Sequence, residues 1–203
     1  MTDYSRQNML HIPRVPCGSI VGCGGTGTWT ALFLAMSGCE KIKLFDTDQL
    51  EPHNLNRLPY TSDNMGELKT KILKDKILEL RPECSILTFG NVEPINYSLL
   101  EGYVYDCTDK RAIQDALQDY CEEKELTYRR VGYDGDHITT LAWGRPQSTE
   151  GVEPEDGYTV IPSWVIPSVL VSALAVYSTH KTLNTKSFVG EIHDLFNMDE
   201  EEK

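Results

Sequence analysis

Positive charge is scarce in this sequence. Nineteen lysines and arginines stand against 31 aspartates and glutamates, which gives the 203-residue chain a formal net charge of -12. Such a chain would repel a phosphate backbone or an anionic lipid surface, so we expect neither a nucleic acid nor a membrane as its partner. A nucleotide can still bind where a helix N-terminus or a few basic side chains receive its phosphates.

Paired cysteines are also lacking. The six cysteines include no C-x-x-C spacing, which disfavours a four-thiolate zinc site. The first residues contain no apolar core of the kind found in secretory signals. Free thiols without a signal sequence predict a cytoplasmic protein.

One stretch, residues 157–179, contains no charged residue and is long enough to be considered as a membrane span. Two prolines, several hydroxyl side chains and an acidic segment before it argue against a span. We expect instead a buried helix over residues 163–182.

Strand-like and helix-like segments alternate along the rest of the chain. Short apolar or alternating runs predict strands at 18–22, 41–45, 85–89, 102–105, 126–131, 138–143 and 188–192. Helical spacing predicts helices at 26–36 and 66–80, and a third helix that Asp109 caps. This order is typical of an α/β fold with a doubly wound, mainly parallel, Rossmann-like sheet.

The length predicts a single domain over residues 1–203. An N-terminal arm at 1–16 precedes the first predicted strand. Residues 145–158 predict a surface loop, because they combine proline, glycine, serine and acidic residues. An acidic tail at 198–203 is expected to be solvated.

A glycine-rich loop joins the first predicted strand to the first predicted helix. Gly22, Gly24 and Gly27 fit the pattern G-x-G-x-x-G, and Gly25 adds a further glycine. Glycines let the backbone approach a phosphate closely, and the helix N-terminus supplies amide donors. Asp46 ends the second strand, where a carboxylate accepts hydrogen bonds from ribose hydroxyls. The pattern predicts a nucleotide site and, taken alone, also fits an NAD-dependent dehydrogenase.

Further motifs surround this loop in a fixed order. They are YSRQ at 4–7, DTDQLEPHNLNR at 46–57, GELK at 66–69 and DCTD at 106–109. Together they resemble the ThiF/MoeB/HesA family, the adenylating domain also found in ubiquitin-activating enzymes. The resemblance runs from Tyr4 to about Trp143. It implies an enzyme that binds Mg-ATP and transfers AMP to a carboxylate, releasing pyrophosphate.

The resemblance also implies roles for four charged residues. Arg57 and Lys69 are the cations at the phosphates, where negative charge builds up during the transfer. Asp109 helps to hold magnesium. Arg6 matches an arginine that, in family dimers, reaches the phosphate site of the neighbouring subunit, so a homodimer is expected.

Three further residues are carried over to the nucleotide site. Asp46 matches the ribose-binding acid of the family, Asn54 matches its nucleotide-contacting asparagine, and Asp48 is assigned to the same site. The chain departs from the family at three positions, which are Leu58 for glutamine, Lys110 for asparagine and Gln114 for arginine. These departures affect contacts beside the site rather than nucleotide binding itself.

The acceptor of AMP is less well defined. The zinc-binding cysteine pairs of many relatives are absent, and residues 144–182 contain no cysteine, which disfavours a thioester or persulfide step. The compact chain favours a small-molecule carboxylate, for example the pyridinol carboxylate activated in biosynthesis of the iron-guanylylpyridinol cofactor. The C-terminus of a peptide, a sulfur carrier or a ubiquitin-like protein is the alternative. An NAD-binding or non-catalytic partner module is a third reading.

Residues 129–137 follow a predicted strand and supply candidates for the acceptor pocket. Tyr133, Asp134 and His137 could line it, and an ordinary surface turn fits them equally well. Trp143 and Trp164 are expected in the core rather than in the pocket.

Overall fold

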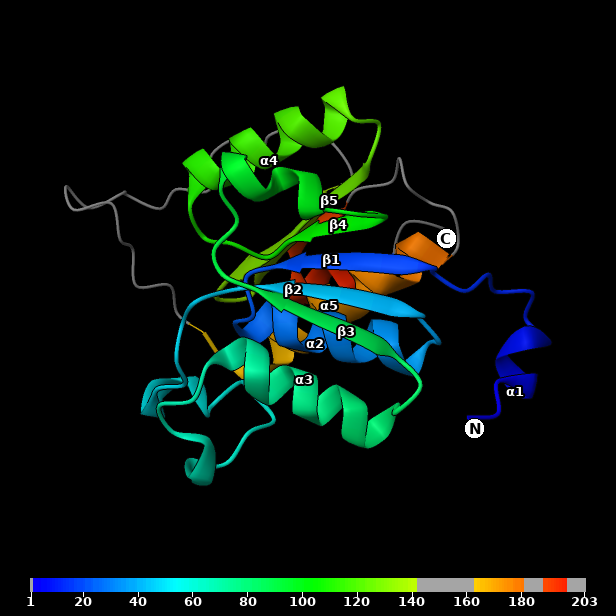
Figure 1. Ribbon diagram of the computed structural model, residues 1–203, viewed down its shortest axis with the longest axis horizontal. Coiled ribbons are helices and arrows are strands. Elements are labelled where there is room, and N and C mark those ends of the chain that lie inside the picture. The colour runs from blue at the N-terminus through cyan, green and yellow to red at the C-terminus, as the bar shows by residue number, and fades with distance from the viewer. Residues whose placement is uncertain (1, 142–162, 181–187, 197–203) are drawn as a thin grey trace.

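The computed structural model describes residues 2–141, 163–180 and 188–196 (Figure 1). A seven-stranded sheet with the order β3-β2-β1-β4-β5-β6-β7 forms its centre. The first five strands pair in parallel, and β6 and β7 add on antiparallel. The predicted Rossmann-like α/β fold is therefore confirmed. The strands are β1 Cys17–Val21, β2 Lys41–Phe45, β3 Ser85–Phe89, β4 Tyr103–Asp106, β5 Thr127–Asp134, β6 His137–Leu141 and β7 Phe188–Glu191.

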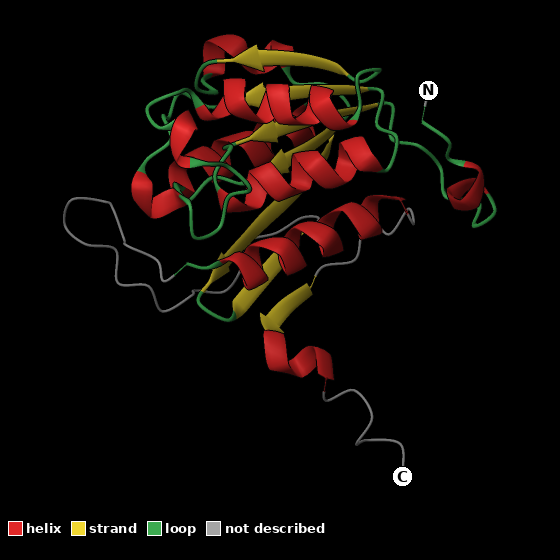
Figure 2. Cartoon of the chain, turned by 90° about the horizontal axis from the view of Figure 1, so that it is seen from below, coloured by secondary structure: helices red, strands yellow, loops and turns green. Residues whose placement is uncertain are grey.

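Helices cover both faces of the sheet. In Figure 1, α4 lies over one face, whereas α2, α3 and α5 lie over the other, the side seen in Figure 2. The α-helices are α1 Ser5–Asn8, α2 Gly25–Met36, α3 Lys69–Leu80, α4 Arg111–Glu123 and α5 Val165–His180. The described residues also form four 3-10 helices, which are η1 Pro52–Asn54, η2 Ser62–Asn64, η3 Pro94–Leu99 and η4 Ile192–Phe196.

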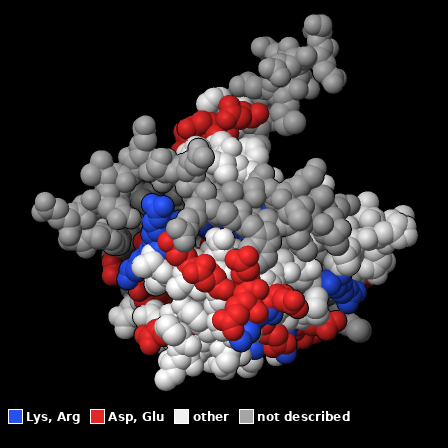
Figure 3. Space-filling model, turned by 90° about the horizontal axis from the view of Figure 1, so that it is seen from above, with Lys and Arg blue, Asp and Glu red and all other residues white. Residues whose placement is uncertain are grey.

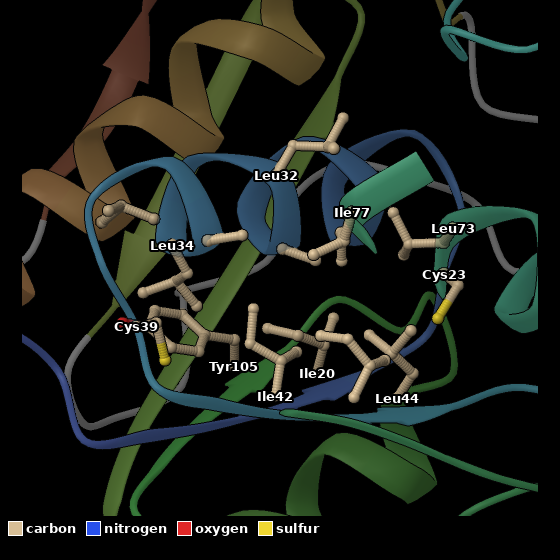
Figure 4. Close-up of a cluster of buried hydrophobic side chains, with 14 of the residues drawn as sticks. Ile20, Cys23, Leu32, Leu34, Cys39, Ile42, Leu44, Leu73, Ile77 and Tyr105 are labelled. Atoms are coloured by element: carbon tan, nitrogen blue, oxygen red, sulfur yellow. The ribbon is translucent and has the colours of Figure 1, made fainter. Parts of the chain in front are cut away.

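The larger part of the core lies between the sheet and the layer of α2, α3 and α5. Ile20, Ile42 and Leu44 from neighbouring strands meet Leu34 of α2 and Tyr105 of β4, all fully buried (Figure 4). Helix α2 is uncharged and mostly small or apolar, which suits a helix packed between the sheet and α5. This packing fixes the start of α2, where the glycine loop lies.

The predicted starts of α3 and α4 differ from the structure. Helix α3 begins at Lys69 rather than at residue 66, because Gly66 has φ of 79°, a left-handed backbone that ends the preceding turn. Helix α4 begins at Arg111 with Lys110 as its N-cap, so the prediction that Asp109 caps it is wrong. Asp109 stays exposed in the loop after β4.

Helix α5 is only partly buried, unlike the buried helix expected at 163–182. Ser168, Ser172 and Thr179 lie on its buried face, and Ile166 and Tyr177 are 42% and 56% exposed. Within the described ranges, no helix combines the length and apolarity required to cross a bilayer.

Other predictions concern two tryptophans, a loop and the acidic tail, all outside α5. Trp164, just before α5, is 46% exposed, so its predicted place in the core is wrong. A solvent-facing indole is tolerated there because Trp164 precedes the first packed turn of α5. Trp143, the loop at 145–158 and the tail at 198–203 lie outside the described residues.

Acidic side chains gather on the face that carries α4. Figure 3 looks onto this face, and Asp and Glu cover more of its described surface than Lys and Arg do. The negative charge of the chain is therefore visible on the side of the sheet away from α2 and α5.

Candidate active site

The candidate site lies where three parallel strands end side by side. Strand β1 leads into the glycine loop, β2 into Asp46 and β4 into the loop from Asp106 to Asp109. Ligands of doubly wound folds bind at this edge of the sheet. The long loop of residues 46–68 lies at the same edge, on the left of Figure 1.

The glycines of the loop have different tasks. Gly22 has φ of 87°, and a Cβ there would lie 2.9 Å from the carbonyl oxygen of Cys107. A Cβ at Gly27 would overlap the carbonyl oxygen of Gly22, so Gly27 permits the close packing of α2 on β1. Gly24, the N-cap of α2, has open space where its Cβ would be. The first amides of α2, which have no partner within the helix, therefore lie beside open space at Gly24.

Gly25 serves packing as well as the loop. A Cβ there would lie 2.8 Å from Ser168 Oγ of α5 and 3.1 Å from Cδ of Arg57. Ser172 Oγ donates a hydrogen bond to the carbonyl of Thr26 at 2.8 Å, which docks α5 on the same turn of α2. The space at Gly25 is thus taken up by protein atoms.

Asp46 ties the glycine loop to the end of β2. Its carboxylate accepts hydrogen bonds from the amides of Cys23 at 2.6 Å and Asp48 at 2.7 Å. Burial raises the pKa of this carboxyl, and the two amide donors partly offset that effect. Each oxygen keeps a second lone pair, so the group can still accept from a ribose hydroxyl.

Contacts with Asp48, two residues after Asp46, hold Lys69 at the end of β2. Its ammonium donates to Asp48 Oδ2 at 2.9 Å, and its amide donates to the carbonyl of Asp48, also at 2.9 Å. An isolated bridge between Gln49 and Leu68 closes the long loop and brings Lys69 back to the end of β2. The Lys69 side chain is 10% exposed and that of Asp48 67%, so the pair has one buried and one solvated member.

Arg57 lies against the first turn of α2, at Gly25 of the glycine loop. Trp29 of α2 donates its indole N–H to the carbonyl of Arg57 at 2.9 Å. The guanidinium of Arg57 donates to the carbonyl of His53 and to Asn56 Oδ1, both at 2.9 Å. These contacts keep the Arg57 stem against the start of α2.

Asn54 is buried, with an exposed fraction of 3%. Its Oδ1 accepts from the amide of Glu51 at 3.1 Å and so caps the turn η1. Within the described contacts its side-chain amide donors are unused, and these are the groups that could meet a nucleotide.

The loop after β4 carries Asp109. Its base is the fully buried carboxylate of Asp106, which accepts from the amide and hydroxyl of Thr108, at 3.1 and 2.7 Å, and from the Tyr128 hydroxyl at 2.7 Å. Burial is the main influence on Asp106 and raises its pKa. Asp109 itself is exposed, and no described residue pairs with its carboxylate.

The surroundings of Asp109 are compatible with magnesium. The described ranges contain no group of three or more His, Cys, Asp or Glu side chains that could hold a metal ion by themselves. Mg²⁺ commonly keeps several waters and binds through one or two carboxylates plus the phosphates of a substrate. A single open carboxylate near the glycine loop fits that mode.

The three departures from the family pattern have local explanations. Leu58 is 6% exposed and belongs to the core, and Lys110 is the N-cap of α4. Gln114, also buried, donates to the carbonyl of Thr108 at 2.5 Å and accepts from Arg130 of β5. Arg130 was not among the predicted site residues, because its only sequence signal was its place beside Arg129 in a predicted strand.

Arg6 lies at the opposite end of the molecule from the glycine loop. It is exposed, and its neighbour Gln7 donates to the carbonyl of Ser37, just past the end of α2, at 2.9 Å. Arg6 lines a pocket of about 560 Å³ together with Met36, Tyr177 and other residues of α1, α2 and α5. The structure thus does not bring Arg6 to Arg57 or Lys69 within one chain.

The acceptor candidates sit together on the hairpin of β5 and β6. Asp134 pairs with His137 across the hairpin, and Tyr133 packs against the core. His137 Nδ1 lies 3.7 Å from Glu191 of β7. No described hydrogen bond or ion pair joins Tyr133, Asp134 or His137 to the residues around the glycine loop.

No cysteine of the site is prepared for nucleophilic attack. The thiol of Cys23 points into the core (Figure 4), and burial raises its pKa well above the usual range. Burial also raises the pKa of Cys107, beside Asp106. Thiolates at these positions are therefore disfavoured near neutral pH.

The ThiF family matches residues 6–184 of the sequence. The chain belongs to this family. The resemblance inferred from the motifs is thereby confirmed.

Several relatives of this ThiF-family chain are known. The tRNA threonylcarbamoyladenosine dehydratase of Haemophilus influenzae is 32% identical over 119 residues, covering 56% of this chain and 46% of that protein. The probable molybdopterin-synthase adenylyltransferase of Porphyra purpurea is 35% identical over 108 residues, covering 51% and 28%. This chain therefore spans half or less of the length of these curated relatives.

The fold is shared with MccB of E. coli. The MccB structure solved with ATP has a TM-score of 0.74 at 19% identity, covering 95% of this chain and 72% of MccB. A second structure, with MccA-N7isoASN, has a TM-score of 0.75 at 18% identity, covering the same shares. At 18–19% identity, the similarity between this chain and MccB shows a common fold and no more.

Proposed function

We propose that this protein is an ATP-dependent adenylyltransferase that activates a carboxylate as acyl-AMP and releases pyrophosphate. The observation that carries the proposal is the set of groups around the open backbone at Gly24. Asp46 accepts from the amide of Cys23, the residue before Gly24, with Lys69 nearby, and the stem of Arg57 lies against Gly25, the residue after it. An acid for ribose and two cations for phosphates at the start of a helix suit a nucleoside triphosphate.

The proposed reaction begins with an oxygen of the acceptor carboxylate attacking the α-phosphorus. The bond from this phosphorus to the bridging oxygen breaks, and pyrophosphate leaves with the electron pair. Arg57 and Lys69 stabilise the charge that develops, because they are held by protein contacts before the reaction starts. Asp109 would hold a bound magnesium ion in part, and that ion would supply Lewis-acid stabilisation of the leaving pyrophosphate.

For the acceptor we propose a small-molecule carboxylate, such as a pyridinol carboxylate in the synthesis of an iron-guanylylpyridinol cofactor. Every described cysteine is free and most are buried, which supports a reaction that stops at acyl-AMP. The relatives also support the alternative of a peptide or carrier-protein C-terminus, since MccB has been solved with MccA-N7isoASN. The tyrosine, aspartate and histidine of the β5–β6 hairpin remain our candidates for the acceptor pocket.

We also propose a homodimer in which Arg6 serves the neighbouring subunit. Helix α2 has 12 residues and is about 18 Å long, so an arginine at its far end does not reach its own glycine loop. The surface around Arg6 is apolar, with Leu10, Met36 and Tyr177 exposed by 63%, 47% and 56%. Contiguous exposed apolar surface supports a contact with a second copy of the chain.

ATP–pyrophosphate exchange tests the activity directly. Labelled pyrophosphate should enter ATP only when magnesium and a suitable carboxylate are present, and a panel of small acids, peptides and carrier-protein C-termini identifies the class. Calorimetry with ATP and with NAD is the companion measurement. Tight binding of NAD without binding of ATP would falsify the proposal.

A further inference from the structure

Thr108, the residue before Asp109, is held from two sides. Its amide and hydroxyl both donate to the buried carboxylate of Asp106. Its carbonyl accepts from the side-chain amide of Gln114 at 2.5 Å. That carbonyl belongs to the peptide unit that leads into Asp109, so the direction in which Asp109 leaves the loop depends on Gln114.

Gln114 is in turn held by Arg130. The guanidinium of Arg130, on β5, donates to Gln114 Oε1. An amide side chain can otherwise turn by 180° and exchange its oxygen and nitrogen at nearly equal cost. A cation at the oxygen prevents this exchange, because the reversed amide would direct its N–H groups at a guanidinium. Arg130 therefore fixes the nitrogen of Gln114 toward the carbonyl of Thr108.

Arg130 also contributes charge to this buried cluster. In the parallel pairing it lies opposite Asp106. Burial raises the pKa of that carboxyl, and the positive charge of Arg130 is a lesser influence that lowers it. Both donors of Thr108 are accepted by one oxygen of that carboxylate, Oδ1. Arg130 therefore adjoins both groups that hold Thr108, which are Gln114 and Asp106.

We propose that Arg130 and Gln114 are positioning residues that hold the Thr108–Asp109 peptide so that Asp109 meets the magnesium ion of the nucleotide. This inference rests on the proposed function, in which Asp109 is the metal-binding acid. Neither residue touches the reacting atoms in this scheme. Residues that orient metal ligands typically contribute about 10- to 100-fold to metal affinity when tested by mutation.

Manganese binding tests the inference without turnover. The full-length protein, saturated with a non-hydrolysable ATP analogue, is titrated with Mn²⁺ and the free ion is measured by electron paramagnetic resonance. We expect Arg130→Gln to weaken Mn²⁺ binding about tenfold. Gln114→Glu keeps an acceptor for Arg130 but loses the N–H that meets Thr108, and we expect a similar loss. The matched control is Arg111→Gln, which removes an exposed positive charge at the start of α4 and should change nothing.

Two comparisons make the outcome decisive. Wild-type Mn²⁺ affinity in folded Arg130→Gln and Gln114→Glu proteins overturns the inference; if the first does not fold, the second gives the answer. Asp109→Asn is measured in parallel, because normal metal affinity in that variant refutes the assignment of Asp109 in the proposed function instead. In exchange assays, the positioning variants should raise the magnesium concentration for half-maximal rate and approach the wild-type rate at saturating magnesium.

Discussion

At the scale of single residues, Asp46 combines a structural and a binding task. Its carboxylate holds the amides of Cys23 and Asp48 and so shapes the loop before any ligand arrives. Burial raises its pKa above that of an ordinary aspartate, about 3.9. The same environment that builds the site therefore makes it sensitive to acid.

Nucleotide affinity should fall on mild acidification. A ribose hydroxyl donates to ionised Asp46, and because the pKa of the free protein is raised, protonation removes this acceptor at a higher pH than for a solvated aspartate. Calorimetry with a non-hydrolysable ATP analogue at several pH values measures the effect. Asp46→Asn should bind weakly with a flatter pH profile, whereas the exposed Asp63→Asn should behave like the wild type. An unchanged profile in Asp46→Asn would assign the pH dependence to another group.

The two cations should matter more for rate than for binding. Arg57→Ala and Lys69→Ala should each slow pyrophosphate exchange by about a hundredfold or more, because each removes a preorganised positive group from developing charge. Their affinity for the ATP analogue should fall much less. Lys71→Ala, on the exposed side of α3 and paired with Glu67, is the control and should keep its rate. Normal exchange by the Lys69 variant would contradict its assigned role.

At the scale of elements, the start of α2 is where three segments meet. The glycine loop precedes it, α5 packs on its first turn, and the stem of Arg57 lies against it. Two adjacent glycines face different surroundings here. Gly25 is enclosed by protein atoms, and Gly24 has open space.

Alanine at these two positions should separate packing from binding. Gly25→Ala should destabilise the protein by about 1–3 kcal/mol even without nucleotide, since its methyl group would crowd Ser168 and Arg57. Gly24→Ala should leave thermal stability almost unchanged and weaken binding of the ATP analogue, because its methyl group occupies the open approach. Thermal melts with and without analogue distinguish the two effects. Equal melting temperatures in the two apo variants would contradict this division.

Local patterns predicted most elements well. The strands at 41–45 and 85–89 have the predicted bounds, because each is a short run between strong turn signals. The start of α3 was missed since Gly66 belongs to a turn closed by the distant bridge between Gln49 and Leu68. Arg130 of β5 and Gln114 of α4 meet only once α4 packs on the sheet, so the spacing of residues along the chain does not predict their contact.

At the scale of the whole molecule, the glycine loop and the arm of Arg6 lie at opposite ends of α2. Each chain therefore presents a nucleotide site at one end and an arginine at the other. A symmetric pair of chains that exchanged their arms would form two equivalent sites.

Mixing of subunits tests this arrangement. Arg6→Ala and Lys69→Ala should each be nearly inactive as pure proteins. In the mixed dimer, one site carries both changes and the other carries neither, so up to half of the activity of a wild-type dimer should return. If native mass spectrometry shows exchange of subunits and no activity returns, Arg6 does not act in the partner's site.

The hydrogen bond from the Trp29 indole to the carbonyl of Arg57 gives the protein an internal optical reporter. Indole emission depends on the polarity and hydrogen bonding around the ring, and this ring is fastened to the residue that is to meet the phosphates. A nucleotide that draws Arg57 inward must alter that bond and with it the emission of Trp29. Replacing the other two tryptophans, Trp143 and Trp164, by phenylalanine leaves one signal to follow. Stopped-flow fluorescence of that variant should then time the arrival of ATP at the glycine loop separately from the chemistry, and Arg57→Ala should abolish the change.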